Sequence, residues 1–237
     1  MIDSDSKSWV FPPPATPGVP VRGSPLLFPV HRLYCVGQNY REHAAEMGAP
    51  ERQPPVFFAK PADAVCTAAT LAWPGMTDKL HHEVELVVAL AAGGRNVPAA
   101  NALSLVFGYA VGVDLTRRDL QEAAKRSGSP WTTGKGFDCS APISAIARVA
   151  DGGHPDDAAI SLSVNGEIRQ QGRTGHMTWR VPEVIAELSR YFELRPGDLI
   201  FTGTPAGVGP LRPGDRVDCR VDGVASLSFR LETGDSE

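Results

Sequence analysis

Residues 81–90, with the sequence HHEVELVVAL, constrain the fold more than any other stretch of this chain. From Val84 onward the stretch is apolar and rich in valine without a helical period, which predicts a strand buried on both faces. Side chains alternate along a strand, so Glu83 and Glu85 project from the same face. Two such carboxylates at the edge of a core repel each other, and a hard divalent cation such as Mg²⁺ or Mn²⁺ would compensate them. The alternative is an exposed strand start with two solvated acids.

The composition favours one domain with many turns. Among 237 residues there are 24 glycines and 21 prolines, which predicts short strands rather than a helical bundle. The net charge of −4, without a basic stripe, argues against nucleic acid as a partner. No apolar run approaches the roughly 18–20 residues of a membrane span, and no secretory signal opens the chain. The four cysteines lie far apart and predict free thiols in a cytoplasmic protein.

Proline sets the N-terminal segment apart from the rest. Several prolines fall between residues 11 and 29, and proline fixes φ and removes a hydrogen-bond donor. We therefore expect residues 1–30 to form an extended arm that wraps the domain, wraps a second subunit or is mobile. Residues 31–237 are expected to form the catalytic domain.

Alternating strand patterns and turn residues dominate that domain. Strands are expected at 31–36, 56–59 (buried) and 107–113, and hairpins at 160–171 and 217–231. Helices are expected at 40–47, 117–127 and 181–192, the second starting from a capping-box-like Thr116-x-x-Asp119. Two Arg-Pro-Gly-Asp turns, at 195–198 and 212–215, each lead to a strand. The expected class is mixed α/β and mainly β, with a few short helices.

Asp114 is the candidate for a third metal ligand. It stands where the apolar strand 107–113 meets a helix start, so it is either a helix cap or a ligand. Together with Glu83 and Glu85 it would complete a face of three carboxylates for an octahedral cation. His81 shares the strand face of both glutamates, and we favour a supporting role for it over direct ligation.

Two further stretches contain candidate functional groups. His43 and Glu46 are spaced i and i+3 on the expected helix 40–47, so they form either a water-activating dyad or an ordinary exposed pair. Lys135 lies between two glycines, which would let the backbone pass close to a ligand. The glycine-rich residues 203–209 lack the lysine of a phosphate loop but could offer backbone N–H groups to a carboxylate.

Five stretches of the chain together resemble the fumarylacetoacetate hydrolase family. They occur in that family's order and span about three quarters of the chain. They are YCVGQNYxxH at 34–43, FAKPAD at 58–63, HHEVEL at 81–86, GVDLTxRDxQ at 112–121 and GTPxGVGP at 203–210. Within the family, residues 11–17 and 169–172 are similar to the fumarylpyruvate hydrolase subgroup of the gentisate pathway.

The resemblance implies a mixed β-sandwich roll, a homodimer, and Mg²⁺ or Mn²⁺ on the three carboxylates. It implies water activation by His43 and Glu46 under a lid, and contact of Lys135 with the substrate's oxo or enolate oxygen. It also implies substrate-carboxylate binding by four residues. They are Lys60, Arg118, Gln121 and Thr204. Arg41, on the expected lid helix, is a further candidate, alongside Arg118, for the distal carboxylate.

The implied reaction is metal-dependent hydrolysis of the C–C bond of an acylpyruvate, with 3-fumarylpyruvate as the expected substrate. A general acylpyruvate hydrolase, an oxaloacetate decarboxylase and an isomerase-decarboxylase of aromatic catabolism remain alternatives, because all of them pass through an enolate. A non-catalytic, metal-stabilised binding module is an alternative of another class.

Overall fold

Strand β8 (Val84–Leu90) lies at the centre of the fold, and all of its residues are buried. The computed structural model describes residues 9–40 and 53–232. Alternate β8 side chains belong to two hydrophobic clusters on opposite faces: Leu86 and Val88 lie in the larger one, and Val87 and Ala89 in the smaller one. The prediction of a strand buried on both faces is therefore confirmed.

A six-stranded sheet is built around β8, with the order β12-β9-β8-β15-β3-β4. The pairing is antiparallel except between β15 and β3, which run parallel. The other strands of this sheet are β12 (Ala147–Arg148), β9 (Val106–Val113), β15 (Asp198–Phe201), β3 (Arg32–Gly37) and β4 (Val56–Lys60).

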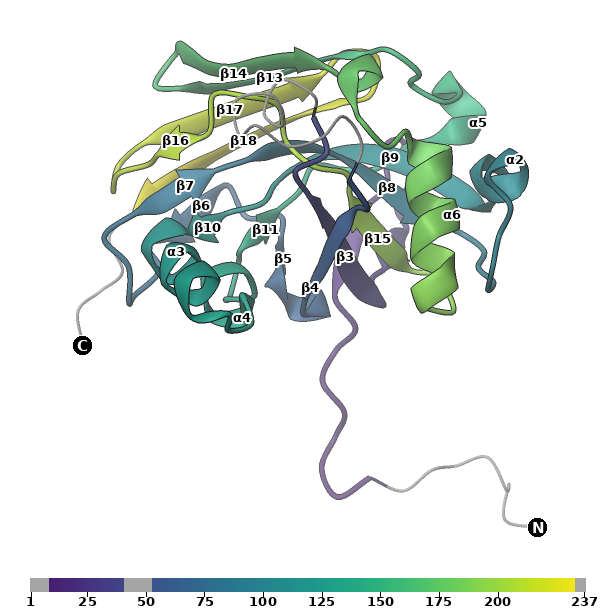
Figure 1. Ribbon diagram of the computed structural model, residues 1–237, viewed down its shortest axis with the longest axis horizontal. Coiled ribbons are helices and arrows are strands. Elements are labelled where there is room, and N and C mark those ends of the chain that lie inside the picture. The colour runs from purple at the N-terminus through teal and green to yellow at the C-terminus, as the bar shows by residue number, and fades with distance from the viewer. Residues whose placement is uncertain (1–8, 41–52, 233–237) are drawn as a thin grey trace.

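A five-stranded sheet packs over one face of the first sheet, and the larger hydrophobic cluster fills the space between them (Figure 1). Its order is β14-β13-β17-β18-β6, and only β18 and β6 pair in parallel. The strands are β14 (Glu167–Arg173), β13 (Ala159–Val164), β17 (Arg216–Val221), β18 (Ala225–Glu232) and β6 (Thr70–Ala72). The fold is thus mixed α/β and mostly β, as expected.

Small sheets and short helices complete the described structure. The sheets are β10-β7-β16, formed by β10 (Thr116–Arg117), β7 (Leu80–His82) and β16 (Gly209–Pro210); β5-β11, formed by β5 (Val65–Cys66) and β11 (Ala141–Pro142); and β1-β2, formed by β1 (Gly18–Pro20) and β2 (Leu27–Pro29). The α-helices are α2 (Ala99–Ala102), α3 (Arg118–Ser127), α4 (Thr132–Lys135), α5 (Val149–Gly152) and α6 (Val181–Tyr191). The 3₁₀ helices are η1 (Ala62–Ala64), η2 (Leu103–Leu105) and η3 (Thr174–His176). None of the helices in the described ranges has the length and apolar character needed to span a membrane.

The turns follow the local sequence closely. Asn165 and Gly166 both have positive φ between β13 and β14, which is the type I′ geometry expected of Asn-Gly. In both Arg-Pro-Gly-Asp turns the aspartate side chain accepts a hydrogen bond from the arginine N–H, at 2.8 Å for Asp198 and 2.7 Å for Asp215. These matching turns lead into β15 and β17.

The N-terminal arm contains more structure than its prolines suggested. Strands β1 and β2 pair antiparallel, and Val19 and Phe28 are buried in the smaller hydrophobic cluster beside β8 and β15. Residues 18–30 therefore pack on the main sheet. The division into an arm and a catalytic domain at residue 30 stays a prediction.

Two local predictions were wrong. Residues 56–59 were expected to be buried, but β4 is an edge strand with partly exposed side chains, because an apolar sequence does not reveal which strand ends a sheet. Thr116 was expected to begin a helix, but it lies in β10, and α3 starts at Arg118 without a side-chain cap. The C-terminal stop was predicted correctly, since Gly128 adopts the left-handed conformation after Ser127.

Candidate functional site

Three buried carboxylates meet where β8 and β9 lie side by side. Glu83 occupies a break between β7 and β8, Glu85 lies within β8, and Asp114 directly follows β9. The pairing of β8 with β9 brings Asp114 next to Glu83, whose backbone oxygen accepts a hydrogen bond from the Asp114 N–H at 2.8 Å. One oxygen atom from each carboxylate lies within 4.8 Å of the others. The structure thus brings together the three residues that the sequence predicts as metal ligands.

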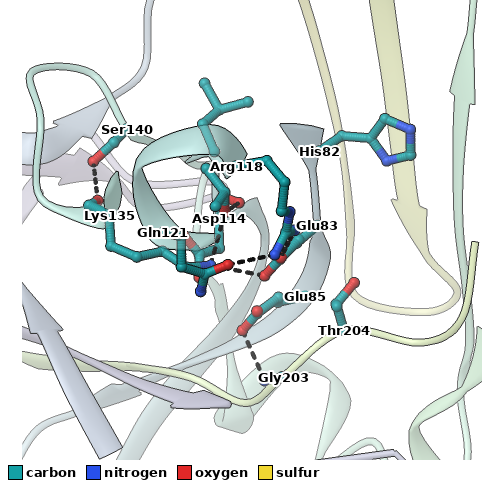
Figure 2. A network of polar contacts seen from close by, with 12 residues as sticks. His82, Glu83, Glu85, Asp114, Arg118, Gln121, Lys135, Ser140, Gly203 and Thr204 are labelled. Atoms are coloured by element: carbon teal, nitrogen blue, oxygen red, sulfur yellow. Dashed lines mark hydrogen bonds and ion pairs between the residues drawn. The ribbon is translucent and has the colours of Figure 1, made fainter. Parts of the chain in front are cut away.

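The Lys135 side chain holds two of these carboxylates in place (Figure 2). Lys135 Nζ donates hydrogen bonds to Glu83 at 2.9 Å, to Asp114 at 2.7 Å and to the Thr116 hydroxyl at 2.7 Å. Burial by itself lowers the pKa of Lys135, but the carboxylates of Asp114 and Glu83 outweigh it and raise the pKa. Lys135 therefore stays charged in the site.

Lys60 supports the same cluster, although it does not line the cavity. Its Nζ forms an ion pair with Asp114 at 2.8 Å and donates to the backbone oxygens of Leu115, at 3.2 Å, and Lys135. Two of its N–H bonds thus go to backbone oxygens, and its charge is paired with Asp114. Lys60 was predicted to bind substrate, but in this structure its partners are the site residues themselves.

Arg118, at the first turn of α3, binds Glu83 from the other side. Its guanidinium group donates to the Glu83 carboxylate and to the Gln121 side-chain oxygen. Burial on its own would raise the pKa of Glu83, but Lys135 and Arg118 reverse that effect and lower it. Glu83 is therefore ionised and held by two cationic side chains.

Glu85 differs from its two neighbours. Its described hydrogen-bond partner is the Gly203 N–H, at 2.7 Å, and within the described ranges no lysine or arginine pairs with it. Burial, followed by repulsion from Asp114 and Glu83, raises the pKa of Glu85 well above its ordinary value. Negative charge is thus poorly compensated at this end of the cluster.

This arrangement fits a hard divalent cation. All three donors are carboxylate oxygens, the class that Mg²⁺ and Mn²⁺ prefer. Asp114 Oδ1 is buried and accepts no hydrogen bond of good geometry from the described residues, although Lys60 lies near it. A cation bound beside Glu85 and Asp114 would satisfy both groups.

A cavity of about 280 Å³ opens over the carboxylates. Of the residues predicted to bind substrate, Arg118, Gln121 and Thr204 line it, and Lys135 lies in its wall. His81 also lines the cavity, but it is not among the residues whose ligand atoms cluster together. His43, Glu46 and Arg41 lie outside the described residues, so their roles stay predictions.

Sequence reasoning missed three residues that line this cavity. Phe58 and Trp131 have ring centroids 5.6 Å apart, and Lys125 Nζ lies 5.2 Å from the centre of the Trp131 ring. Lys125 follows Arg118 by seven positions and Gln121 by four, so the three share one face of α3. That spacing could have identified Lys125, whereas Phe58 and Trp131 come together only through the tertiary fold.

Residues 203–210 form the wall opposite α3. Gly203 has φ of +96°, and a Cβ atom there would lie 2.7 Å from the Asn39 Cβ, so only glycine fits. The Asn39 side chain is hydrogen-bonded to the backbone of Thr202 and Trp179. These contacts hold Gly203 in the position from which its N–H reaches Glu85.

Known proteins are similar to this chain in both sequence and architecture. The family model described as fumarylacetoacetate (FAA) hydrolase C-terminal matches residues 32–232. The crystal structure of fumarylpyruvate hydrolase from Pseudomonas aeruginosa, in complex with Mn²⁺ and pyruvate, has a TM-score of 0.93 and 49% identity, covering 96% of this chain and all of that one.

Relatives known by another activity are also similar. An oxaloacetate tautomerase from Escherichia coli is 43% identical over 89% of this chain and 96% of its own length. A mitochondrial oxaloacetate tautomerase from Oryza sativa subsp. japonica is 41% identical over 87% of this chain and 93% of its own. The family model covers most of the chain, and these relatives are 41–49% identical to it. The protein is therefore an enzyme that belongs to the fumarylacetoacetate hydrolase family.

Proposed function

We propose that this enzyme hydrolyses the C–C bond of an acylpyruvate, with 3-fumarylpyruvate as its substrate and fumarate and pyruvate as its products. The observation that carries the proposal is the cavity in which Glu83, Glu85 and Asp114 face Lys135. In support, the Pseudomonas aeruginosa fumarylpyruvate hydrolase matches 96% of this chain at 49% identity and holds Mn²⁺ and pyruvate. Its sequence identity to this chain is higher than the 41–43% identity of the oxaloacetate tautomerases described above.

Glu83, Glu85 and Asp114 are the residues that would hold Mg²⁺ or Mn²⁺. Such a cation would supply Lewis acidity at the α-keto acid end of the substrate. Lys135 Nζ contacts two of these carboxylates and lies 5.1 Å from the centre of the Phe58 ring. The charge of Lys135 is therefore fixed before substrate arrives.

The side chains around the cavity have separate roles in the reaction. Gln121 and the Thr204 hydroxyl bind the carboxylate next to the keto group and orient the substrate. His43, assisted by Glu46, takes a proton from water as its oxygen attacks the distal carbonyl carbon. The C–C bond then breaks and its electron pair moves into the pyruvate enolate, which is protonated on carbon to give pyruvate. The positive charge of Lys135, held in place by Glu83, Asp114 and Thr116, stabilises through its electric field the negative charge that grows on the enolate oxygen toward the transition state.

The distal carboxylate of fumarylpyruvate needs a cation of its own, because a buried carboxylate without a partner is costly. Arg118 was one candidate, but its guanidinium group already binds Glu83 and Gln121. Lys125 lines the same cavity and forms no ion pair within the described part of the chain. We assign the distal carboxylate to Lys125, with Arg41 as a second candidate.

Oxaloacetate tautomerisation is the second candidate function, because relatives at 41–43% identity are known by that activity. It needs the same carboxylates and Lys135, since it also forms an enolate, but it needs no attacking water. Activity after loss of the general base therefore separates the two functions.

The test is a product analysis of the metal-loaded enzyme with 3-fumarylpyruvate, acetylpyruvate and oxaloacetate. We expect fumarate and pyruvate in equal amounts from fumarylpyruvate, and a loss of roughly 10²–10⁴-fold in kcat for His43→Ala. Rapid tautomerisation of oxaloacetate, with no cleavage of either acylpyruvate, would favour the second function. If metal removal affected stability alone and neither activity existed, the chain would be a binding module. Homodimeric assembly and a cytoplasmic location stay predictions, to be tested by sedimentation and by cell fractionation.

A further inference from the structure

Gln170 is a buried side chain that connects the two walls of the site, although it lies in strand β14 and does not line the cavity. One atom of its amide lies 3.0 Å from the Val84 backbone N and 2.9 Å from His82 Nδ1. A backbone N–H can only donate, so this atom is the amide oxygen. His82 Nδ1 must then carry a proton. The oxygen is thus bound to both sides of the strand break that contains Glu83.

The amide nitrogen of Gln170 points to the opposite wall. It donates to the Thr204 hydroxyl oxygen at 2.7 Å and to the Pro205 backbone oxygen at 2.9 Å. Both amide hydrogens and both oxygen lone pairs of Gln170 therefore have partners. Because Thr204 Oγ1 accepts this hydrogen bond, its own hydrogen is free to point into the cavity that Thr204 lines.

Close packing keeps Gln170 in this position. A Cβ atom on Gly207 would lie 2.1 Å from the Arg169 backbone oxygen, so residues 203–210 rest directly on β14. At its far end the same segment pairs with β7, where Gly209 is opposite His82. Figure 2 shows His82 directed away from the carboxylates and Thr204 beside Glu85. Gln170 therefore sits between three elements that are already in contact.

We propose that Gln170 is a positioning residue, which fixes the Thr204 hydroxyl as a hydrogen-bond donor toward the α-keto carboxylate of the bound ligand. An unconstrained threonine hydroxyl can donate or accept, and it would lose part of its affinity for a carboxylate by pointing the wrong way. The inference deepens the proposed function, on which it rests only in that the cavity takes an α-keto carboxylate.

Gln170→Glu reverses the hydrogen bond with almost no change of shape. When ionised, the new carboxylate still accepts from Val84 and His82, but it can donate neither to Thr204 Oγ1 nor to the Pro205 backbone oxygen, so the Thr204 hydroxyl turns its hydrogen toward residue 170. We expect the affinity of the Mn²⁺-loaded enzyme for oxalate, measured by calorimetry, to fall at least tenfold. The affinity for Mn²⁺ itself should change less than threefold. Gln171→Glu is the matched control, because Gln171 is exposed on the same strand.

Variants at Thr204 separate positioning from a general structural role. Thr204→Val should reduce the affinity for oxalate about as much as Gln170→Glu does, whereas Thr204→Ser should retain the parent's affinity. Adding Gln170→Glu to Thr204→Val should cause no further loss of affinity. Should Gln170→Glu fail to fold, Gln170→Met replaces it, with the same expected loss and the same lack of additivity.

Unchanged oxalate affinity in Gln170→Glu, or losses that add in the double variant, would overturn the proposal. A parent enzyme that binds no oxalate with Mn²⁺ present would also overturn it. A parent that binds oxalate but cleaves no acylpyruvate would contradict the proposed function alone, because oxalate binding needs no turnover.

Discussion

The two ends of the carboxylate cluster are neutralised in different ways. Asp114 and Glu83 face the ammonium groups of Lys60 and Lys135 and the guanidinium group of Arg118. Glu85 lies in the central strand β8. It accepts one hydrogen bond, from the Gly203 backbone N–H. A single amide dipole cannot balance a buried carboxylate, so negative charge is in excess at the Glu85 end. This difference indicates that a bound divalent cation would neutralise most charge at the Glu85 end of the cluster.

The contrast has its origin in the elements that form each wall. One wall comes from α3 and α4, whose Arg118 and Lys135 side chains reach the carboxylates. The other wall is the segment 203–210, which offers backbone groups and the Thr204 hydroxyl. Charges on the first wall are fixed in advance, whereas the second wall binds through polar groups that Gln170 orients.

The largest expected effect is on the cationic wall. Asp114→Asn leaves Lys135 and Lys60 without one carboxylate in a buried site, so the metal-free unfolding free energy should fall by about 3 kcal/mol or more. Urea unfolding in the presence of a chelator measures it, and Glu122→Gln on α3 is a control at an exposed carboxylate. An unchanged midpoint would show that Asp114 is not held by the two lysines.

Cation binding should stabilise the parent and reveal the charge excess. A cation at a free concentration of 100 times its dissociation constant should raise the unfolding free energy by about 2.7 kcal/mol. The measurement is thermal unfolding against Mn²⁺ concentration. Glu85→Gln should show no such dependence, and a full response in that variant would remove Glu85 from the ligand set.

A smaller effect is expected at Lys125, which lines the cavity and forms no ion pair with a carboxylate among the described residues. Lys125→Ala should reduce the preference for fumarylpyruvate over acetylpyruvate about tenfold in kcat/KM, which corresponds to 1.4 kcal/mol. Arg126→Ala, one position further along α3 and not in the cavity wall, is the matched control. Equal preference in the parent and Lys125→Ala would assign the distal carboxylate elsewhere.

The smallest effect distinguishes the two ends of the cluster in the absence of metal. Glu85→Gln replaces a buried carboxyl group that no cation compensates with a neutral amide, so the metal-free unfolding free energy should stay unchanged or rise by about 1 kcal/mol. Urea unfolding next to Asp114→Asn makes the comparison. A loss as large as that of Asp114→Asn would mean that both ends are equally well neutralised.

Local patterns explain which parts of the molecule could be predicted. The β8 strand, the Asn165-Gly166 turn and the end of α3 at Gly128 each depend on a few neighbouring residues. The carboxylate cluster was accessible too, because Glu83 and Glu85 share a strand face and Asp114 ends an apolar strand. Sequence spacing was enough for the strand, the turn and the helix end, and it made the three carboxylates candidates.

The remaining features depend on contacts between distant segments. Gln170 lies more than eighty positions from His82, and only the packing of β14 against residues 203–210 shows that its amide joins both walls. Thr116 carries a helix-cap signal, yet its hydroxyl is bound to Lys135. Edge position was equally hidden, since the sequence of β4 is as apolar as that of an inner strand.

The central claim is that Glu85 completes a cation site whose other half is already neutralised. Calorimetric titration of Mn²⁺ into the metal-free parent and into Glu85→Gln tests it most directly. We predict one site per chain in the parent and no measurable binding in the variant, whose metal-free unfolding midpoint equals or exceeds that of the parent. Binding of Mn²⁺ by Glu85→Gln with the affinity of the parent would contradict the claim.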